Sequence, residues 1–315
     1  MAWTLKRIGV SLLLVWVVAS VVFLALRAVP GDPAELLLAQ GGAAPDPAVV
    51  AELREQLGLD RPLGAQYVDR FRRLLRGDFG VSLQDGAPVG AEIFRRLPRT
   101  LELIGAAALI SLLLGLPAGL LAALRGGWAD RSLSWVSAGG LAMPVFVAGT
   151  LMVLVFAQWL RWAPAGGYVP LAQDPGRHFA LLAMPAATIS LGLFSTVFRM
   201  TRAAVLDVST RDYIRTARAK GVRWPRVVTR HILRNAMIPV VTVLALNLGT
   251  LLGGTVLVEY VFNYPGLSGL LVDAVNARDY PVVEGIVLVI SALFVALNLC
   301  VDLIYAVLDP RVRHA

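Results

Sequence analysis

Cysteine, histidine and charged residues are all scarce in this chain of 315 residues. It has one cysteine, Cys300, and three histidines. A single thiol excludes an intramolecular disulfide framework, and the sequence has neither paired cysteines nor an H-E-x-x-H pattern, the spacings typical of zinc sites. We therefore expect no metal site.

The phosphate-binding motif G-x-x-x-x-G-K-[ST] is also absent. Without that loop and its lysine, we expect no ATP hydrolysis by this chain itself and no bound cofactor. A serine hydrolase is not supported either, because no histidine lies between Ser268 and Arg313 to act as the general base. The residues predict a protein that is not an enzyme.

Apolar residues are abundant: 57% of the chain is hydrophobic, 16% is charged, and the mean hydropathy is +0.70. This composition is typical of a membrane protein with several spans. The formal charge of +8 would suggest nucleic acid in a soluble protein. Here the basic residues stand beside apolar runs, where membrane topology explains them, so we expect no nucleic-acid partner.

Six apolar runs are long enough to cross a bilayer as helices, and they predict an all-α polytopic membrane protein. Gly115, Gly119 and Pro117 in the second run, and Pro144 and Pro185 in later ones, indicate close helix packing and kinks. The predicted spans are Ile8–Val29, Thr100–Leu124, Leu133–Leu160, Phe179–Val197, Ile238–Val258 and Val282–Leu308.

Charge predicts the orientation of these six spans. With the N-terminus inside, the inner segments hold sixteen Lys and Arg residues, whereas the short outer loops hold three. Both termini are then cytoplasmic and residues 30–99 form a small extracytoplasmic insert. The predicted domains are residues 1–29, the insert 30–99, a five-helix core 100–308 that contains the cytoplasmic segment 199–236, and a cytoplasmic tail 309–315.

Residues 211–239 form a basic segment with helical periodicity between two of the apolar runs. It has eight Lys and Arg from Arg211 to Arg234 and one acid, Asp212. Gly221 and Pro225 predict a turn between two helices. An ordered basic element of this kind is typical of a site where another protein docks. It is equally typical of a loop held at anionic lipid, and the residues alone leave both interpretations open.

Polar side chains inside apolar runs are costly, so we expect them to face the bundle or a water-filled path. For Glu284 we expect a structural role, such as reaching the headgroup region. The candidates for a substrate path are Asn247, Asn298 and Asp302.

Longer motifs give the chain a resemblance to a known family, the permease subunits of ATP-binding cassette importers for peptides and nickel. It is similar to the first of their two permeases over nearly its full length. The motifs are Val29-Pro30-Gly31-Asp32-Pro33, Leu57-Gly58-Leu59-Asp60-Arg61-Pro62, Arg76-Gly77-Asp78-Phe79-Gly80, Val258-Glu259-Tyr260-Val261-Phe262-Asn263-Tyr264-Pro265-Gly266-Leu267, Arg278-Asp279-Tyr280-Pro281 and Leu308-Asp309-Pro310-Arg311.

In that family the E-A-A-x3-G loop forms a coupling helix that docks in a cleft of the ATPase. Ala217 and Gly221 keep this signature, whereas Arg215 replaces the acid, and His231 and Arg234 replace the isoleucine and proline expected after the glycine. The form R-T-A-R-A-K-G resembles the peptide-importer version. The coupling residues that the resemblance implies are Tyr213, Arg215, Thr216, Ala217, Arg218, Ala219, Lys220, Gly221, Trp224 and Pro225.

The resemblance also implies partners and a mechanism. The partners are a second homologous permease, two ATPase subunits that bind the ATP, an extracytoplasmic solute-binding protein and the lipid bilayer. The expected location is a bacterial or archaeal cytoplasmic membrane, and the expected mechanism is alternating access. The cargo stays open between dipeptides, longer peptides, glutathione, nickel complexes and haem. The competing hypothesis is a channel or receptor subunit that works without ATPases.

Overall fold

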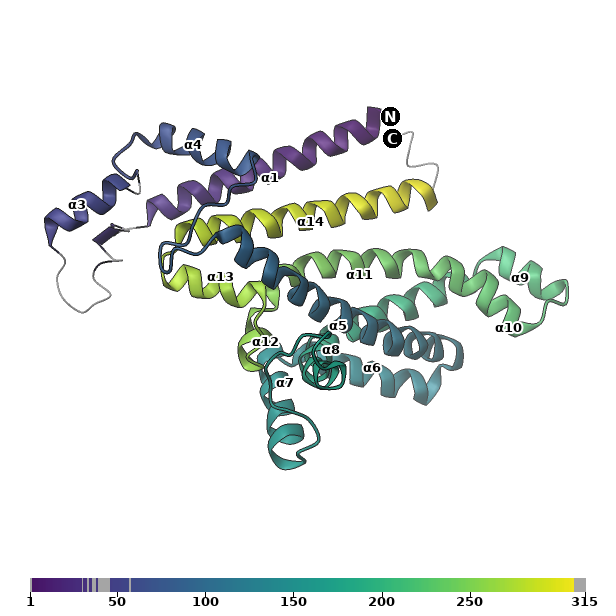
Figure 1. Cartoon of the computed structure of the whole chain (residues 1–315). Coiled ribbons are helices and arrows are strands. Elements are labelled where there is room, and N and C mark those ends of the chain that lie inside the picture. Colours follow the sequence, from purple (N-terminus) through teal and green to yellow (C-terminus); the bar gives the residue numbers. More distant parts are fainter. Residues whose placement is uncertain are drawn as a thin grey trace. The chain divides into compact units, whose positions relative to one another are not determined.

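The computed structural model describes residues 2–29, 31, 32, 34, 35, 38, 46–56 and 58–308, with side chains omitted for 2–6, 56 and 300–308. These residues are almost entirely helical, as predicted (Figure 1). Outside the helices, the described part contains one isolated β-bridge, between Val81 and Pro88.

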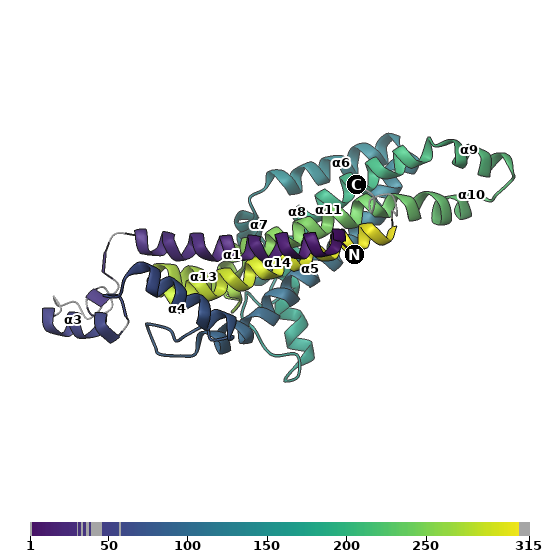
Figure 2. The same cartoon turned by 90° about the horizontal axis from the view of Figure 1, so that it is seen from above.

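The chain divides into two compact units, Met1–Pro98 with Leu270–Leu299 and Arg99–Gly269 with Cys300–Ala315. In the first unit, α1 runs beside α14 in both Figure 1 and Figure 2. Its helices are α1 (Ala2–Ala28), α3 (Pro47–Gln56), α4 (Leu63–Leu75) and most of α14 (Tyr280–Leu308), together with the start of α5 (Val89–Arg125) and most of α13 (Leu267–Asn276).

The second unit is built around α8, a helix of 35 residues that is capped by Asp174, whose side chain accepts from the Arg177 N–H. Helices α6, α7 and α11 pack on it, and the apolar core includes Leu103, Leu193 and Phe262. Its elements are the rest of α5, α6 (Gly127–Ala142), α7 (Val145–Met152), the π-helical η1 (Val153–Trp159), α8 (Pro175–Ser209), α9 (Asp212–Ala219), α10 (Trp224–Arg226), the π-helical η2 (Val227–Leu233), α11 (Arg234–Gly254) and α12 (Val256–Val261).

Small residues bring α5 and α8 together. A Cβ atom on Gly119 would lie 2.7 Å from the Phe198 carbonyl oxygen and from the Thr201 side chain. One on Gly115 would meet Val197 at 2.9 Å. The interpretation of these two glycines as a close helix contact is confirmed.

Among the described residues, five helices are long and apolar enough to span a membrane, and a bent pair makes a sixth if it crosses as one span. The predicted span Leu133–Leu160 falls on this pair and is broken beside Pro144. Helices α6 and α7 to η1 meet at an angle of 101°, because the chain leaves the helical conformation at Met143 and restarts after Pro144.

Several other boundaries differ from the sequence prediction; α8, for example, runs from Pro175 to Ser209 and exceeds the predicted Phe179–Val197 at both ends. Helix α5 begins at Val89, not Thr100, and its first turns are supported by Glu92, whose oxygens lie 2.6 Å from Arg95 and 2.5 Å from Arg96. Helix α11 ends at Gly254, so Val258 belongs to the separate helix α12.

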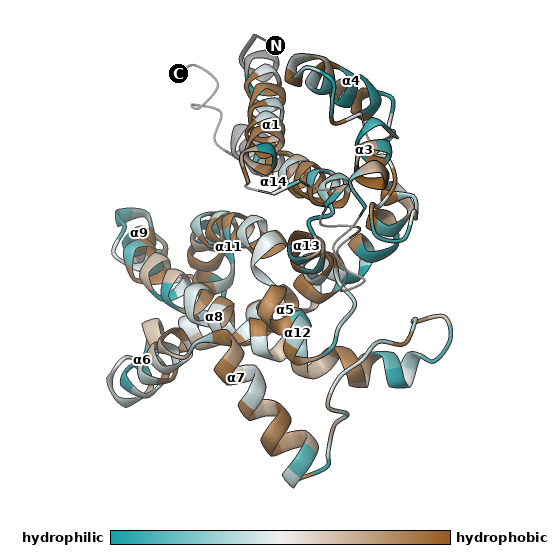
Figure 3. Ribbon diagram, turned by 90° about the vertical axis from the view of Figure 1, so that its left-hand side faces the viewer, coloured by the Kyte–Doolittle hydropathy of each residue, from teal (hydrophilic) through white to brown (hydrophobic). Residues whose placement is uncertain are grey.

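Polarity is distributed unevenly over these elements. Figure 3 shows the long helices mostly in brown, whereas α3, α4 and α9 carry much of the teal. The sequence of residues 48–57 and 63–76 also predicts helices, and the structure confirms them as α3 and α4.

Candidate functional site

The basic segment between α8 and α11 forms two helices joined by a tight turn, as predicted. Helix α9 ends at Ala219, Lys220 is its C-cap, and Gly221 takes the left-handed conformation with φ +76°. The Gly221 N–H donates to the Arg218 carbonyl at 2.9 Å, and the Val222 N–H donates to the Ala217 carbonyl at 3.2 Å. This pair of bonds is the Schellman motif, which closes a helix at a glycine.

The second helix of the segment starts at Trp224, with Pro225 in its first turn. Proline suits this position because the first N–H groups of a helix have no partner within it. The Arg218 guanidinium carbon lies 4.0 Å from the centre of the Trp224 ring, a cation–π contact across the turn. The turn is therefore held by both backbone and side chains.

An apolar cluster anchors this turn to the ends of α8 and α11. Ile214 from α9 is 1% exposed, and Val227 and Ile232 from η2 are fully buried. They pack with Val205 and Ala236, which are also fully buried. Figure 2 shows α9 and α10 at the far tip of the hairpin formed by α8 and α11.

The predicted coupling residues mostly point away from this cluster. Ala217 is half-buried beside it. The exposed members are Tyr213, Arg215, Thr216, Arg218, Ala219, Lys220, Gly221, Trp224 and Pro225. A rigid turn thus presents cationic and aromatic side chains on a surface that its own unit does not cover.

Two of the three candidates for a substrate path, Asn247 and Asn298, belong to different units. Asn247 on α11 lines a cavity of about 270 Å³ between α7, α8 and α11. Asn298 on α14 belongs to the other unit, is half-buried, and donates to the Phe294 carbonyl at 3.0 Å. The side chain of Asp302 lies outside the described residues.

Comparison with protein families decides the class of the molecule. Residues 115–314 match the family described as the inner membrane component of binding-protein-dependent transport systems, and residues 1–104 match the N-terminal component of such membrane proteins. The chain belongs to this family of importer permeases. It is therefore a multi-pass membrane protein and a transport component, which works with partners such as an ATPase and a binding protein.

Individual relatives cover the permease from end to end. It is 42% identical over 313 residues to the glutathione transport system permease protein GsiC of Salmonella choleraesuis, with 99% of each chain covered. It is 39% identical, at the same coverage, to the probable peptide ABC transporter permease protein y4tP of Sinorhizobium fredii.

Solved structures of transporters share the fold. The inward-facing MetNI methionine ABC transporter aligns with a TM-score of 0.54 at 17% identity, over 69% of this chain and 96% of that chain. An amino acid ABC transporter crystallised with histidines aligns with a TM-score of 0.50 at 16% identity, over 68% and 92%.

The permease also has a buried carboxylate that sequence reasoning did not single out. Glu259 is 2% exposed and accepts hydrogen bonds from Thr100 at 3.1 Å, Thr255 at 3.0 Å and the Gly269 N–H at 2.7 Å. A Cβ on Gly266 would collide with this carboxylate, which explains the glycine after Pro265. Burial raises the pKa of Glu259. The sequence did hold a signal for this site. Glu259 is an acid within a long, mostly apolar motif, and a buried acid needs hydrogen-bond donors around it.

A second polar cluster surrounds His178. Its Nδ1 donates to the Val169 carbonyl at 2.7 Å, and its Nε2 lies 2.7 Å from a Glu102 oxygen. The Tyr264 hydroxyl donates to the Arg99 carbonyl at 3.2 Å, and burial raises the pKa of Tyr264, so the phenol stays neutral. This cluster ties the loop before α8 to α5.

Glu284, for which a structural role was predicted, forms a buried ion cluster with two arginines in the first unit. Its two oxygens lie 2.8 Å from Arg27 and 2.5 Å from Arg70, with 7% of the Glu284 side chain exposed. Arg70 also donates to the Phe79 and Pro281 carbonyls. These arginines join α1 and α4 to α14, so the acid pairs within the protein and not with headgroups.

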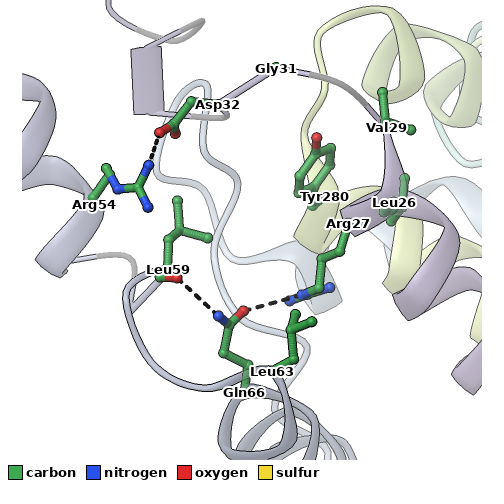
Figure 4. A pocket seen from close by; sticks show the side chains of 10 residues that line it. All are labelled: Leu26, Arg27, Val29, Gly31, Asp32, Arg54, Leu59, Leu63, Gln66 and Tyr280. Carbon is green, nitrogen blue, oxygen red and sulfur yellow. Dashed lines mark hydrogen bonds and ion pairs between the residues drawn. The ribbon is translucent and has the colours of Figure 1, made fainter.

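A cavity of about 350 Å³ lies near the C-terminal end of α1. Figure 4 shows that its polar side chains already pair with one another: Arg54 with Asp32, and Arg27 with Gln66, which in turn donates to the Leu59 carbonyl. Since these groups satisfy each other, this cavity offers little to a ligand. Within the described part of the chain, no three His, Cys, Asp or Glu side chains group as metal ligands would.

Proposed function

We propose that this permease is the first of two homologous permeases of an importer that takes up peptides or a closely related solute such as glutathione. The proposal draws on the two relatives named for peptide and glutathione transport, which align with 99% of the chain. In this proposal two ATPase subunits hydrolyse the ATP, since the chain has no P-loop, and a separate extracytoplasmic binding protein delivers the solute.

The location follows from the charge distribution. Sixteen basic residues fall on the side that carries the α9 turn, and both termini share that side if the bent pair counts as one span. We therefore place α9 and the termini in the cytoplasm and the insert 30–99 outside a bacterial or archaeal inner membrane. The segments 1–29, 30–99, 100–308 and 309–315 then act as first span, outer insert, transport core and inner tail.

The observation that carries the mechanism is the anchored turn at Gly221. Exposed residues from Tyr213 to Pro225 project from a turn that is fixed to α8 and α11 by buried Ile214, Val227 and Ile232. When a partner ATPase closes on ATP, a rigid turn in its cleft transmits the displacement to both helices, whereas a loose loop would absorb it. The coupled movement gives alternating access.

The test replaces Gly221 with aspartate. Gly221→Asp places a carboxylate on the docking surface, and we expect normal membrane levels with loss of ATP-driven uptake. Gly77→Asp is the matched control, because Gly77 has φ +77° and, like Gly221, open space around its Cβ position. Gly77 also closes α4 with the same pair of backbone hydrogen bonds, from the Gly77 N–H to the Leu74 carbonyl and from the Asp78 N–H to the Arg73 carbonyl. Both variants place aspartate at the same position of a Schellman turn, so the docking contact separates them. Normal uptake by Gly221→Asp would count against the docking role.

A further inference from the structure

The cavity that contains Asn247 lies within the second unit, where two helix breaks meet. Its volume is about 270 Å³, just below the usual range of ligand pockets, roughly 300–1,000 Å³. Met143 and Val145, on either side of Pro144, line it together with Gly254, the last residue of α11. Non-helical backbone at membrane depth is tolerated only when buried in protein or lining a cavity. The two breaks cost helical backbone hydrogen bonds, and their position at this cavity makes the cavity a candidate binding site.

The threonine side chains of the cavity have already used their donors. Thr188 donates to the Met184 carbonyl at 2.9 Å, Thr196 to the Gly192 carbonyl at 3.2 Å, and Thr250 to the Asn247 carbonyl at 2.8 Å. A hydroxyl that donates its single hydrogen keeps its lone pairs as acceptors. The three threonines can thus accept hydrogen bonds from a ligand.

Asn247 extends this pattern. Its amide nitrogen donates to the Val243 carbonyl at 2.7 Å. A carbonyl only accepts, so the nitrogen must face Val243. The side-chain oxygen remains available as an acceptor, and the amide nitrogen keeps its second hydrogen as a donor. Asn247 and Thr250 on α11, with Thr188 and Thr196 on α8, thus give the cavity a set of hydrogen-bond acceptors.

No Asp, Glu, Lys, Arg or His lies among the described residues that line the cavity. The rest of the wall is apolar and includes Leu141, Met143 and Leu251. Methionine and leucine adapt to side chains of different shape. A site of this composition recognises N–H donors and does not select for side-chain charge.

We propose that this cavity is a contact site for the backbone N–H groups of the transported peptide, read by Asn247, Thr188, Thr196 and Thr250. This proposal rests on the peptide function proposed above and adds the chemistry of recognition inside the permease. A main-chain contact is common to all peptides, so the permease accepts what the binding protein delivers, whatever its side chains.

The experiment measures ATP-driven uptake by the complete importer in proteoliposomes, with the binding protein saturated by each solute in turn. The solutes are trialanine and trialanine methylated on both amide nitrogens, which lacks the backbone N–H donors. The permease variants are Asn247→Leu and Thr196→Val. Thr150→Val is the matched control, because Thr150 donates to the Phe146 carbonyl in the same way but does not line the cavity.

We expect the wild-type importer to prefer trialanine, and each cavity variant to shrink that preference about three- to tenfold, the effect of one neutral hydrogen bond. Because the binding protein is the same throughout, the change in the ratio isolates the permease contact. Thr150→Val should keep the wild-type ratio. An unchanged ratio in both cavity variants, or an equal change in Thr150→Val, overturns the cavity site. Absence of any ATP-dependent trialanine uptake by the wild type overturns the peptide function itself.

Discussion

At the scale of single residues, burial decides the roles of the acids. Glu284 is buried between two arginines, so its charge is compensated by opposite charge. Glu259 has no such partner among the contacts found, and its carboxylate depends on the Thr100 and Thr255 hydroxyls and the Gly269 N–H. Neutral donors compensate burial less completely than an arginine does, which is why burial raises the pKa of Glu259.

The raised pKa of Glu259 predicts a pH dependence of stability. An acid whose pKa is higher in the folded protein binds its proton more tightly there, so its contribution to stability is present below the ordinary value of 4.5 and is lost as the pH rises through the folded pKa. Each unit of such a shift corresponds to about 1.4 kcal/mol. Glu259→Gln cannot titrate. Relative to this variant, the wild-type protein should lose stability as the pH rises above 4.5.

The measurement is thermal unfolding of both proteins in detergent across that pH range. Glu55→Gln, which removes an exposed acid, serves as the control and should follow the wild-type profile. Parallel profiles for the wild type and Glu259→Gln would contradict the prediction.

At the scale of elements, the hydropathy and capping residues of the sequence predicted those features that depend on neighbouring residues alone. The spans, the helices α3 and α4, and the Gly221 turn all follow from periodicity, length and a single glycine. The bend at Pro144 and the hydrogen-bond cluster around Glu259 could not be predicted in this way. Proline permits either a kink or a break in a membrane helix, and the choice depends on whether the neighbouring helices bury the freed backbone. The donors of Glu259 come from residues as far away in sequence as Thr100, which no local pattern reveals.

Helix α9 has eight residues, too few to be stable alone, so its order depends on the burial of Ile214. Ile214→Ala should lower the free energy of opening of this turn by about 2–5 kcal/mol, because it removes buried apolar contacts. At 2 kcal/mol, the opened state becomes about 30-fold more populated, and tryptic cleavage after Arg218 and Lys220 should accelerate by that factor. Thr216→Ala removes an exposed side chain from the same helix and should leave the cleavage rate unchanged. Equal rates for the two variants would show that Ile214 does not anchor the turn.

At the scale of the whole molecule, the bent pair of α6 with α7 and η1 determines the topology. If the pair crosses the membrane, the chain has six spans and the α9 turn lies on the same side as the N-terminus. If it re-enters on the side it left, there are five spans, and everything from α8 onward changes sides. Charge favours crossing, because re-entry would place the ten basic residues from Arg199 to Arg234 outside.

Two single-cysteine variants distinguish these topologies in a Cys300→Ser background, which removes the only native thiol. Gln173→Cys lies in the exposed turn before α8, and Lys220→Cys lies in the α9 turn. Because α8 runs between them, they must fall on opposite sides of the membrane. For six spans, a membrane-impermeant maleimide should label Gln173→Cys in intact cells and Lys220→Cys only after permeabilisation. The reverse pattern would place the α9 turn outside, where no ATPase could reach it, and would refute the coupling role together with the topology.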